Sequence, residues 1–390
     1  MVKNNKKKIV VAISGGVDSS VAAFLLQKEG DEVIGIFLRL ISGSDVAESQ
    51  ARRVCQRLGI RFYPVNLKAK FKKEVVDYFL DSYALGLTPN PCVKCNRFIK
   101  FGELLKIARG LGANYIATGH YVRNREITNP KSQTKSFKLY RGKDEKKDQS
   151  YFLYNLNQEI LKQVLFPLGD YKKIDIKKIA DKNKLPYLEK ESQDICFLPP
   201  RQAQDKQGEH NDFLKEHLKL KKGKIKLALS LSLPRLRTAG EGADSPAGGE
   251  AGGGEIIGEH QGLPLYTIGQ RRGVEIGGTG PYWVVDCDYK NNILYVTNKK
   301  QDPALFSDEL VVQDVNWVAG VEPKMPLNCL AVIRYGHEGV EAQGSALRVQ
   351  KGQGSALSVR LKKPQRAVTP GQSAVLYNKD EVLGGGIITH

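Results

Sequence analysis

The chain has 390 residues, of which 41% are hydrophobic, and it carries a formal net charge of +18. This length accommodates two or three domains with cores of their own. The lack of any apolar run near the roughly 18 residues of a membrane span excludes a transmembrane protein. The positive charge favours a polyanionic partner, with nucleic acid ahead of an anionic membrane surface and of a basic surface that serves solubility alone.

The chain opens with a predicted strand, loop and helix. Residues 8–13 (KIVVAI) form a short β-branched apolar run, which is typical of a buried parallel strand. Residues 14–20 (SGGVDSS) follow, and residues 19–29 are predicted as a helix that ends at Gly30. Two glycines and a serine in front of a helix allow several N–H groups to point at one phosphate.

This loop differs from the two commoner phosphate-binding loops. No lysine follows the glycines, which excludes the P-loop. No G-x-G-x-x-G motif is present, which excludes the dinucleotide fingerprint. SGGVDSS resembles the pyrophosphate loop of enzymes that cleave ATP between the α and β phosphates. The alternative is an ordinary glycine turn before a helix.

Strands and helices alternate after the loop. The predicted strands are residues 32–38, 61–67 and 113–120, and the predicted helices are residues 45–58, 71–85 and 98–109. Residues 88–96 (TPNPCVKCN) are predicted as a loop because they contain two prolines. The alternation predicts an α/β fold with a doubly wound parallel sheet. Because ligands of such sheets bind at the C-terminal strand ends, one edge would hold residues 14–19, Leu38, Gly119 and His120.

Six cysteines in a chain of this length do not indicate a disulfide framework. Cys92 and Cys95 form a C-x-x-C motif, and Cys196 stands alone in the sequence. The other three lie in apolar helix- or strand-like contexts and are expected to be buried and inert: Cys55, Cys287 and Cys329.

The second half of the chain changes in composition. Residues 228–254 are Gly- and Ala-rich and are interpreted as a flexible insert. A strand pair is predicted at residues 282–285 and 293–297, and short β runs alternate with turns from Leu310 onward. We predict a catalytic domain at residues 1–203, a small central domain at residues 204–305 and a C-terminal all-β barrel at residues 306–390.

The N-terminal lysines, residues 6–8, precede an apolar run and could imitate a signal peptide. Polar residues and glycines at 14–19 interrupt that run, so we reject this interpretation. The first predicted strand begins within ten residues of Met1, which leaves no room for an organelle transit peptide. We therefore expect a cytoplasmic protein.

Eleven short motifs follow one another along the chain: SGGVDSS, TPNPCVKCN, ATGHY, KDQSYFLY, ICF, GEHQGL, TIGQRRG, NNIL, RYG, TPGQSAV and GGGII. In this order, over the whole chain except the insert, they resemble the bacterial tRNA-specific 2-thiouridylase family. That resemblance implies a pyrophosphate-loop fold and ATP-dependent 2-thiolation of the wobble uridine in tRNAs for Lys, Glu and Gln. It also implies tRNA and a persulfide donor protein as partners, no membrane association, and a monomer.

The resemblance implies roles for individual residues. ATP and Mg²⁺ would be bound with the help of Ala12, Ile13, Ser14, Gly15, Gly16, Val17, Asp18, Ser19, Leu38 and Gly119. Asp18 would lie near the Mg²⁺-bound pyrophosphate, whereas Leu38 and Gly119 would flank the adenine. Leu38 stands where the family often has Met. Cys95 matches the family's nucleophile, and Cys196 matches the cysteine that accepts sulfur as a persulfide.

Further matches concern the RNA. Asn90, Pro91 and Cys92 would surround the target base. Contact with tRNA is implied for His120, Lys147, Asp148, Gln149, Arg334, Tyr335 and Gln372. From the residues alone, a solvated strand residue is the favoured interpretation of Arg334 and a turn residue that of Gln372. His120 is equally explained as a ligand contact or as a local hydrogen-bonding group.

Cys92 departs from the best-known members, which have Asp at this position as a general acid or base. A thiol with a free pKa of about 8.5 does not replace a carboxyl with a pKa near 4. Two routes stay open. Cys95 and Cys196 run a persulfide cycle that ends in a disulfide, or Cys92, Cys95 and Cys196 hold a [4Fe–4S] cluster. Structural zinc would need a fourth ligand.

Two other classes of function are considered. Another pyrophosphate-loop enzyme, such as an amide-forming ligase, would share the fold but needs no paired cysteines. A non-catalytic RNA-binding or thiol-redox protein would not need an intact SGGVDSS loop. Release of AMP and pyrophosphate distinguishes the enzyme from the non-catalytic alternatives.

Overall fold

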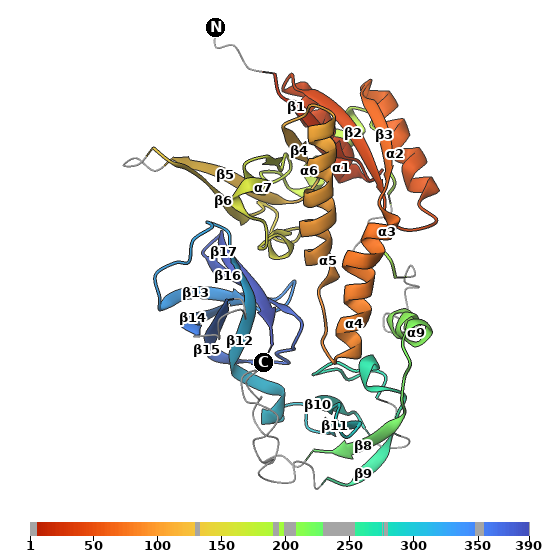
Figure 1. Cartoon of the computed structure of the whole chain (residues 1–390), viewed down its shortest axis with the longest axis vertical. Coiled ribbons are helices and arrows are strands. Elements are labelled where there is room, and N and C mark those ends of the chain that lie inside the picture. Colours follow the sequence, from red (N-terminus) through yellow and green to blue (C-terminus); the bar gives the residue numbers. More distant parts are fainter. Residues whose placement is uncertain are drawn as a thin grey trace.

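The computed structural model describes residues 6–128, 133–189, 195–198, 208–228, 254–274, 276, 280–347 and 355–389 (Figure 1). The predicted insert therefore lies almost wholly outside the described residues. Within them, no helix combines the length and the apolar character that crossing a bilayer requires.

A five-stranded parallel sheet forms the N-terminal part, in the order β3-β2-β1-β4-β7. Its strands are β1 (Lys8–Ala12), β2 (Glu32–Arg39), β3 (Arg61–Asn66), β4 (Tyr115–Ala117) and β7 (Val164–Leu165). Helices α1 (Val17–Lys28), α2 (Asp45–Leu58), α6 (Leu104–Gly110) and α8 (Lys173–Lys182) accompany it.

The helices cover both faces of this sheet because side chains alternate along β1. Ile9 and Val11 pack with the apolar residues of α1 and α2, whereas Val10 packs with Leu104 and Leu105 near the start of α6. The predicted doubly wound sheet is thus confirmed.

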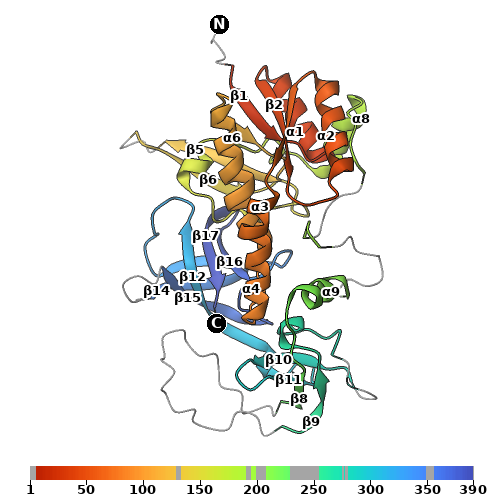
Figure 2. The ribbon, with the colours of Figure 1, turned by 45° about the vertical axis from the view of Figure 1, so that its right-hand side comes forward.

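Two helical rods run from the sheet toward the other end of the molecule (Figure 2). One consists of α3 (Lys68–Phe71), the π-helical η1 (Lys72–Asp77) and α4 (Tyr78–Ala84). The other consists of α5 (Pro91–Lys94), the π-helical η2 (Cys95–Glu103) and α6. The predicted loop over residues 88–96 is therefore wrong from Pro91 onward. Pro91 occupies the first helical turn, where proline is favoured because its missing N–H is not needed.

A hairpin, β5 (Val122–Thr128) and β6 (Lys135–Arg141), follows β4 and was not predicted. Short helices η3 (Ser150–Phe152) and α7 (Gln158–Leu161) lead from it to β7. Beyond α8, helix α9 (Gly208–His217) contributes Leu214 to an apolar cluster with Phe79 and Tyr83 of α4.

A separate four-stranded sheet has the order β10-β11-β8-β9. Its strands are β8 (Gly223–Leu227), β9 (Ile256–His260), β10 (Trp283–Asp288) and β11 (Ile293–Thr297), with η4 (Leu263–Leu265) between the second and third. The predicted strand pair is confirmed as β10 and β11, although β10 begins and ends later than predicted.

The C-terminal part is a closed antiparallel barrel, as predicted. After η5 (Pro303–Leu305), its strands are β12 (Phe306–Trp317), β13 (Leu327–Val332), β14 (Val340–Leu347), β15 (Ala356–Arg366), β16 (Ser373–Asn378) and β17 (Glu381–Ile388). Pairing of β12 with both β15 and β17 closes the barrel.

The hairpin joins this barrel to the rest of the molecule. Strand β6 pairs with β17, with Leu139 opposite Val382 and Tyr140 opposite Glu381. One continuous apolar cluster contains Val10 of the parallel sheet, Leu139 of the hairpin and Tyr377 of the barrel. The sheet and the barrel therefore share a core.

Candidate active site

The glycine loop connects β1 to α1 at the C-terminal edge of the parallel sheet. Gly15 has a φ of +84°, and a Cβ there would lie 2.7 Å from the carbonyl oxygen of Ala47, so both conformation and space require glycine. The Ser19 hydroxyl accepts from the Ser14 N–H at 3.1 Å and donates to the Gly16 carbonyl at 3.1 Å. Gly16 is the N-cap of α1 and has no side chain that could accept from the N–H groups of the first turn. These N–H groups can therefore donate to a bound anion.

Asp18 is held by two residues that the sequence analysis did not identify. Lys173, from the start of α8, places its Nζ 2.8 and 2.7 Å from the two carboxylate oxygens, and the Tyr121 hydroxyl donates to Oδ1 at 2.6 Å. Lys173 is only 8% exposed. It thus places a nearly buried ammonium group, paired with Asp18, beside a loop that lacks the P-loop lysine.

Gly119 lies directly against the start of α1. A Cβ at this position would approach the backbone carbon of Asp18 and the nitrogen of Ser19 to 2.8 Å. The strand end that carries Gly119 and the glycine loop are therefore in contact, as the predicted strand-edge arrangement requires. Leu38, at the end of β2, is partly buried and packs against Phe71.

The residues of the glycine loop can be compared with those that usually hold Mg²⁺. The loop offers one carboxylate, Asp18, and Mg²⁺ is commonly held by one or two carboxylates together with substrate phosphates. The residues present therefore fit a magnesium ion that arrives with a nucleotide.

The three predicted functional cysteines lie close to one another. Cys92 and Cys95 are on the rod that starts at Pro91, and Cys95 is buried in a cluster with Phe71 and Phe197. Phe197 follows Cys196 and contacts Phe71 with ring centroids 5.9 Å apart. This contact brings the segment that carries Cys196 to the helix.

All three thiols have pKa values above the ordinary value. Burial is the main cause for each, and it raises the pKa of Cys95 to about 12. Cys196 lies at the surface, yet the protein atoms around its thiol still raise its pKa by desolvation. Neighbouring thiols raise the pKa of Cys95 further, whereas the charge of Lys100 lowers the pKa of all three.

Lys100 was missed in the sequence analysis for an identifiable reason. Once the helix is known to begin at Pro91, the spacing from Cys95 and Asn96 places Lys100 one turn farther along the same rod. The prediction of a loop over this segment removed that signal.

The same three thiols were considered as iron–sulfur ligands. Among the described residues, no three side chains of His, Cys, Asp or Glu are grouped so that they could hold a metal ion. The arrangement does not fit a cluster, and we derive no step through one.

Three residues predicted to contact RNA, Lys147, Asp148 and Tyr335, lie within electrostatic range of one another. The pKa of Tyr335 is raised by burial and then by the charge of Asp148, and Lys147 and Cys92 are also within electrostatic range. Tyr335 is nevertheless 45% exposed, and its ring lies 4.4 Å from that of Phe152. An exposed aromatic ring offers a surface on which a base can stack.

Other predicted residues use their side chains within the protein. Asp148 is 8% exposed and accepts from the N–H groups of Gly142 and Ser150 at 2.9 and 3.1 Å. Gln149 accepts from the Tyr121 N–H at 3.0 Å, and the Gln372 amide donates to the Thr88 carbonyl at 2.9 Å. These residues position the loops that carry their neighbours.

His120 and Arg334 also have internal partners. His120 is 7% exposed, lies 2.8 Å from the Thr118 hydroxyl, and has its pKa lowered well below the usual value by burial. It is therefore neutral at physiological pH. Arg334 donates to the Ala367 carbonyl at 3.2 Å and is half-buried. Asn90 hydrogen-bonds to the Tyr151 hydroxyl and lowers its pKa, which burial raises more strongly.

Comparison with known proteins gives a consistent result. Residues 7–200 match the family model described as the tRNA methyl transferase HUP domain, residues 249–298 match the tRNA methyl transferase PRC-barrel domain, and residues 307–388 match the aminomethyltransferase beta-barrel domain. The tRNA-specific 2-thiouridylase MnmA of Proteus mirabilis is 40% identical, with 100% of this chain and 98% of that protein covered. The MnmA of a Roseiflexus species is 40% identical, with 98% and 99% covered.

A solved structure is more distantly similar. The U34-tRNA thiolase NcsA from Methanococcus maripaludis, with its [4Fe–4S] cluster, is 19% identical. The alignment covers 50% of this chain and 63% of that chain, with a TM-score of 0.34. This likeness is too slight to support any statement about the site.

Proposed function

The chain belongs to the tRNA-specific 2-thiouridylase family, and from this membership we propose that it is an ATP-dependent tRNA-uridine 2-sulfurtransferase. It replaces the 2-oxygen of the wobble uridine with sulfur in tRNAs for Lys, Glu and Gln. Its relatives of matching length carry the name of this tRNA thiolation activity. The observation that carries the proposal is the packing of Phe197 against Phe71 in the cluster that contains Cys95, because it brings the segment of Cys196 to the helix of Cys92 and Cys95.

In the first step the loop at residues 14–19 binds the phosphates of MgATP. The N–H groups at the start of α1 would bind the phosphates, and Asp18, which Lys173 holds in place, would bind a magnesium ion that offsets the phosphate charge. The 2-oxygen of uridine attacks the α-phosphorus, and pyrophosphate leaves. The product is an O-adenylated uridine in which AMP is a good leaving group.

In the second step sulfur replaces this oxygen. Cys196 first receives a sulfur atom from a persulfide donor protein and becomes a persulfide. The terminal sulfur attacks C2 of the adenylated base, AMP leaves with the oxygen, and the base is joined to Cys196 through a disulfide. The Cys95 thiolate attacks the Cys196 sulfur, so the electron pair of the broken S–S bond stays on the base as 2-thiouridine. The Cys95–Cys196 disulfide that forms must be reduced by an external thiol.

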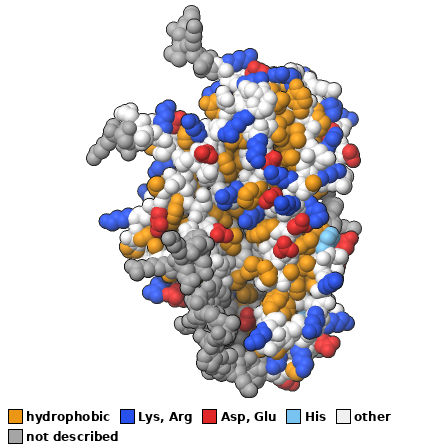
Figure 3. Space-filling model, in the orientation of Figure 1, with side chains coloured by type: hydrophobic (Ala, Val, Ile, Leu, Met, Phe, Trp, Pro, Cys, Tyr) orange, Lys and Arg blue, Asp and Glu red, His pale blue; other side chains and the backbone are white. Residues whose placement is uncertain are grey.

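We propose that the work is divided among three domains. Residues 1–203 bind ATP and carry the cysteines, residues 204–305 form a small central domain, and residues 306–390 form the barrel that supports RNA binding. The net charge of +18 favours binding of tRNA phosphates, and Lys and Arg side chains are scattered over the face seen in Figure 3. The protein acts as a cytoplasmic monomer.

The test is formation of 2-thiouridine by iron-free protein. Unmodified tRNA, MgATP and a persulfide donor are supplied, and nucleosides, AMP and pyrophosphate are measured. We expect 2-thiouridine with the unaltered chain, none with Cys196→Ser or Cys95→Ser, and unchanged tRNA binding in both variants. Cys329→Ala, in the barrel, is the control and should thiolate normally.

Three results would contradict the proposal in different ways. Weak tRNA binding by Cys196→Ser would make that cysteine structural. Activity that requires anaerobic cluster reconstitution would replace the persulfide route by a cluster ligated by Cys92. The absence of AMP and pyrophosphate in every preparation would favour a non-catalytic RNA-binding or thiol-redox protein.

A further inference from the structure

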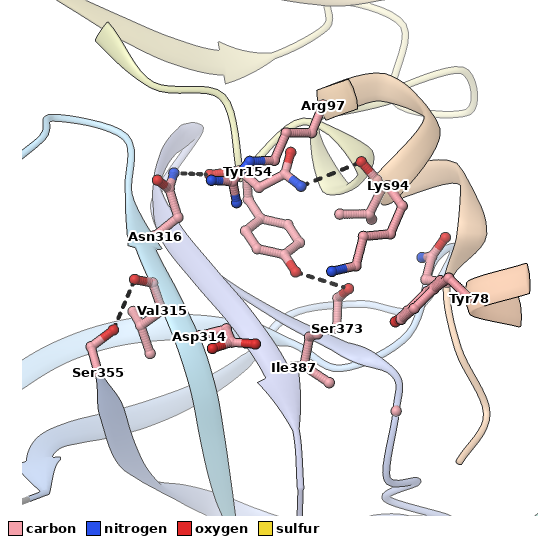
Figure 4. A pocket seen from close by; sticks show the side chains of 14 residues that line it. Tyr78, Lys94, Arg97, Tyr154, Asp314, Val315, Asn316, Ser355, Ser373 and Ile387 are labelled. Atoms are coloured by element: carbon pink, nitrogen blue, oxygen red, sulfur yellow. Dashed lines mark hydrogen bonds between the residues drawn. The ribbon is translucent and has the colours of Figure 1, made fainter. Parts of the chain in front are cut away.

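A polar cavity of about 290 Å³ lies between the barrel and the helical rod that begins at Pro91 and consists of α5, η2 and α6. Asn90, Val93, Lys94 and Arg97 line its helical side, because positions three and four apart share one face of a helix. Strands β12, β16 and β17 form the opposite side (Figure 4). Neither Cys92 nor Cys95 lines it, so the cavity is separate from the thiols, although Asn90, two residues before Cys92, is part of its lining.

Charged groups of both signs line this cavity. Burial lowers the pKa of Lys94, and the charge of Asp314 partly opposes this shift. Lys94 is half-buried and lies over the Tyr78 ring at 4.8 Å, whereas Arg97 is exposed and lies over the Phe98 ring at 5.4 Å. Asp314 is exposed on the barrel side. In the part of the chain that the structure describes, no ion pair joins any of these three groups to a partner. No direct ion pair of these groups therefore has to break when a ligand binds.

The backbone of β12 directs Asp314 toward this space. Its φ is +52°, which is uncommon for a residue other than glycine but is tolerated by Asp. The pairing of β12 with β17 shifts register between Gln313 and Asn316. Such a bulge inserts extra residues into one strand and re-aims a side chain, and backbone strain of this kind is concentrated at binding sites.

Asn155 provides the second observation. Its side chain is 7% exposed, and its amide nitrogen donates to the Val93 carbonyl at 3.3 Å. Asn155 is one of the residues that line the same cavity, and its buried Oδ1 has no hydrogen-bond partner among the described residues. A buried acceptor without a donor is unfavourable, so a ligand that donates an N–H or O–H to this oxygen would be stabilised.

We propose that this cavity binds the nucleotide of tRNA next to the target uridine, with its phosphate at Lys94 and Arg97 and its base at Asp314 and Asn155. This inference rests on the proposed function. Two cations suit a phosphate, and two acceptors suit the N–H donors on the edge of an unstacked base. Tyr78 and Tyr154 add aromatic surface to the same lining. Asn90 connects the cavity to the position of the target base.

The base contact is tested with the full chain and a set of unmodified tRNAs that differ only at the two nucleotides flanking the target uridine. The unaltered protein should bind the preferred base at one flanking position roughly 5- to 100-fold more tightly than the others, as expected for a paired hydrogen-bond contact. Asp314→Asn should reduce this preference to under about threefold. Equal preference in both proteins, or no preference at either position, would overturn the inference.

The phosphate contact is tested by salt dependence. Arg97→Gln should weaken binding of all these tRNAs to a similar extent and lower the slope of log affinity against log salt by about one. Arg97→Lys should restore the slope. Lys28→Gln is the matched control, because it removes an exposed charge at the far end of α1. If Arg97→Gln leaves the slope unchanged, the phosphate is bound elsewhere and the proposed phosphate contact is wrong.

Two further measurements separate the possible failures. Each variant should retain its ATP affinity and its thermal unfolding midpoint, which shows that loss of RNA affinity is local. If the unaltered chain forms 2-thiouridine and the cavity variants bind tRNA normally, only the present inference fails. If the unaltered chain forms none, the proposed function fails and the inference fails with it.

Discussion

Among individual residues, Lys100 has the widest influence on the thiol chemistry. Its charge lowers the pKa of Cys92, Cys95 and Cys196, whereas burial raises the pKa of each. Only the thiolate form attacks sulfur. Burial has the larger effect, so the pKa of Cys95 is raised to about 12. The thiolate fraction of Cys95 therefore rises with pH throughout the neutral range.

Replacing Lys100 with Gln removes this lowering, so the pKa of the thiols should rise further. A tenfold smaller thiolate fraction follows from each added unit of pKa, and we expect single-turnover thiolation at pH 7.5 to fall roughly 3- to 10-fold. The rate–pH profile should shift to higher pH and recover there. Lys106→Gln, an exposed lysine farther along the same rod, should leave the profile unchanged.

An identical loss of rate at every pH would instead indicate a structural role for Lys100.

Individual residues also show which contacts sequence analysis could predict and which it could not. The SGGVDSS loop was found because its residues are contiguous, whereas Lys173 reaches Asp18 across 155 positions. No local pattern reports such a contact. Asp148 and Gln149 were matched by position, but the sequence could not indicate that their side chains bond within the protein.

Among the elements, strands and helices with clear periodicity were predicted well. Buried strands such as β1 and β2 are continuous apolar runs, and α2 begins and ends at the predicted residues. The helix that begins at Pro91 was missed because proline is common both in loops and in the first turn of a helix. The β5–β6 hairpin was missed because its strands are mostly polar at their outer ends and find their apolar partner only in the barrel.

The contact between the β4 end and α1 makes a prediction at this scale. Gly119→Ala places a Cβ 2.8 Å from the backbone of Asp18 and Ser19, so the loop must shift. We expect a loss of about 1–3 kcal/mol in the free energy of unfolding and roughly 10- to 100-fold weaker ATP binding, measured by calorimetry.

Gly110→Ala is the matched control for this substitution. It lies at the end of α6 with open space around the added Cβ, so it should leave ATP affinity unchanged and raise the free energy of unfolding by about 0.4–1 kcal/mol. Normal ATP binding by Gly119→Ala would show that the loop tolerates displacement, and the close contact would then have no role in nucleotide binding.

For the whole molecule, the shared core joins parts that the sequence presents as separate domains. Tyr377 of the barrel is fully buried, hydrogen-bonds to Ser150 at 3.0 Å and lies 4.0 Å from the Arg141 guanidinium. It belongs to the same apolar cluster as Val10 of the parallel sheet. The sequence indicated a barrel and a sheet, but their common core depends on pairings between residues far apart in the chain.

Tyr377→Ala should therefore weaken both parts of the molecule. We expect a loss of about 3–5 kcal/mol in the free energy of unfolding, as for other large aromatic truncations in cores. Hydrogen exchange should accelerate in β1 and β4 as well as in β16 and β17. Val321→Ala, at a site 71% exposed, should change neither the free energy of unfolding nor the hydrogen-exchange rates. Faster exchange confined to the barrel would show that the two parts unfold independently.

The pairing of β6 with β17 also has a consequence for synthesis on the ribosome. Lys138 and Glu381, which form an ion pair across this junction, are 243 residues apart. At about 5–20 residues per second, the hairpin emerges roughly 10–50 seconds before its partner strand exists. During that interval its outer edge presents unpaired backbone groups, which other chains can pair with. Glu381 and Val382, which pair with this edge, are translated only after that interval.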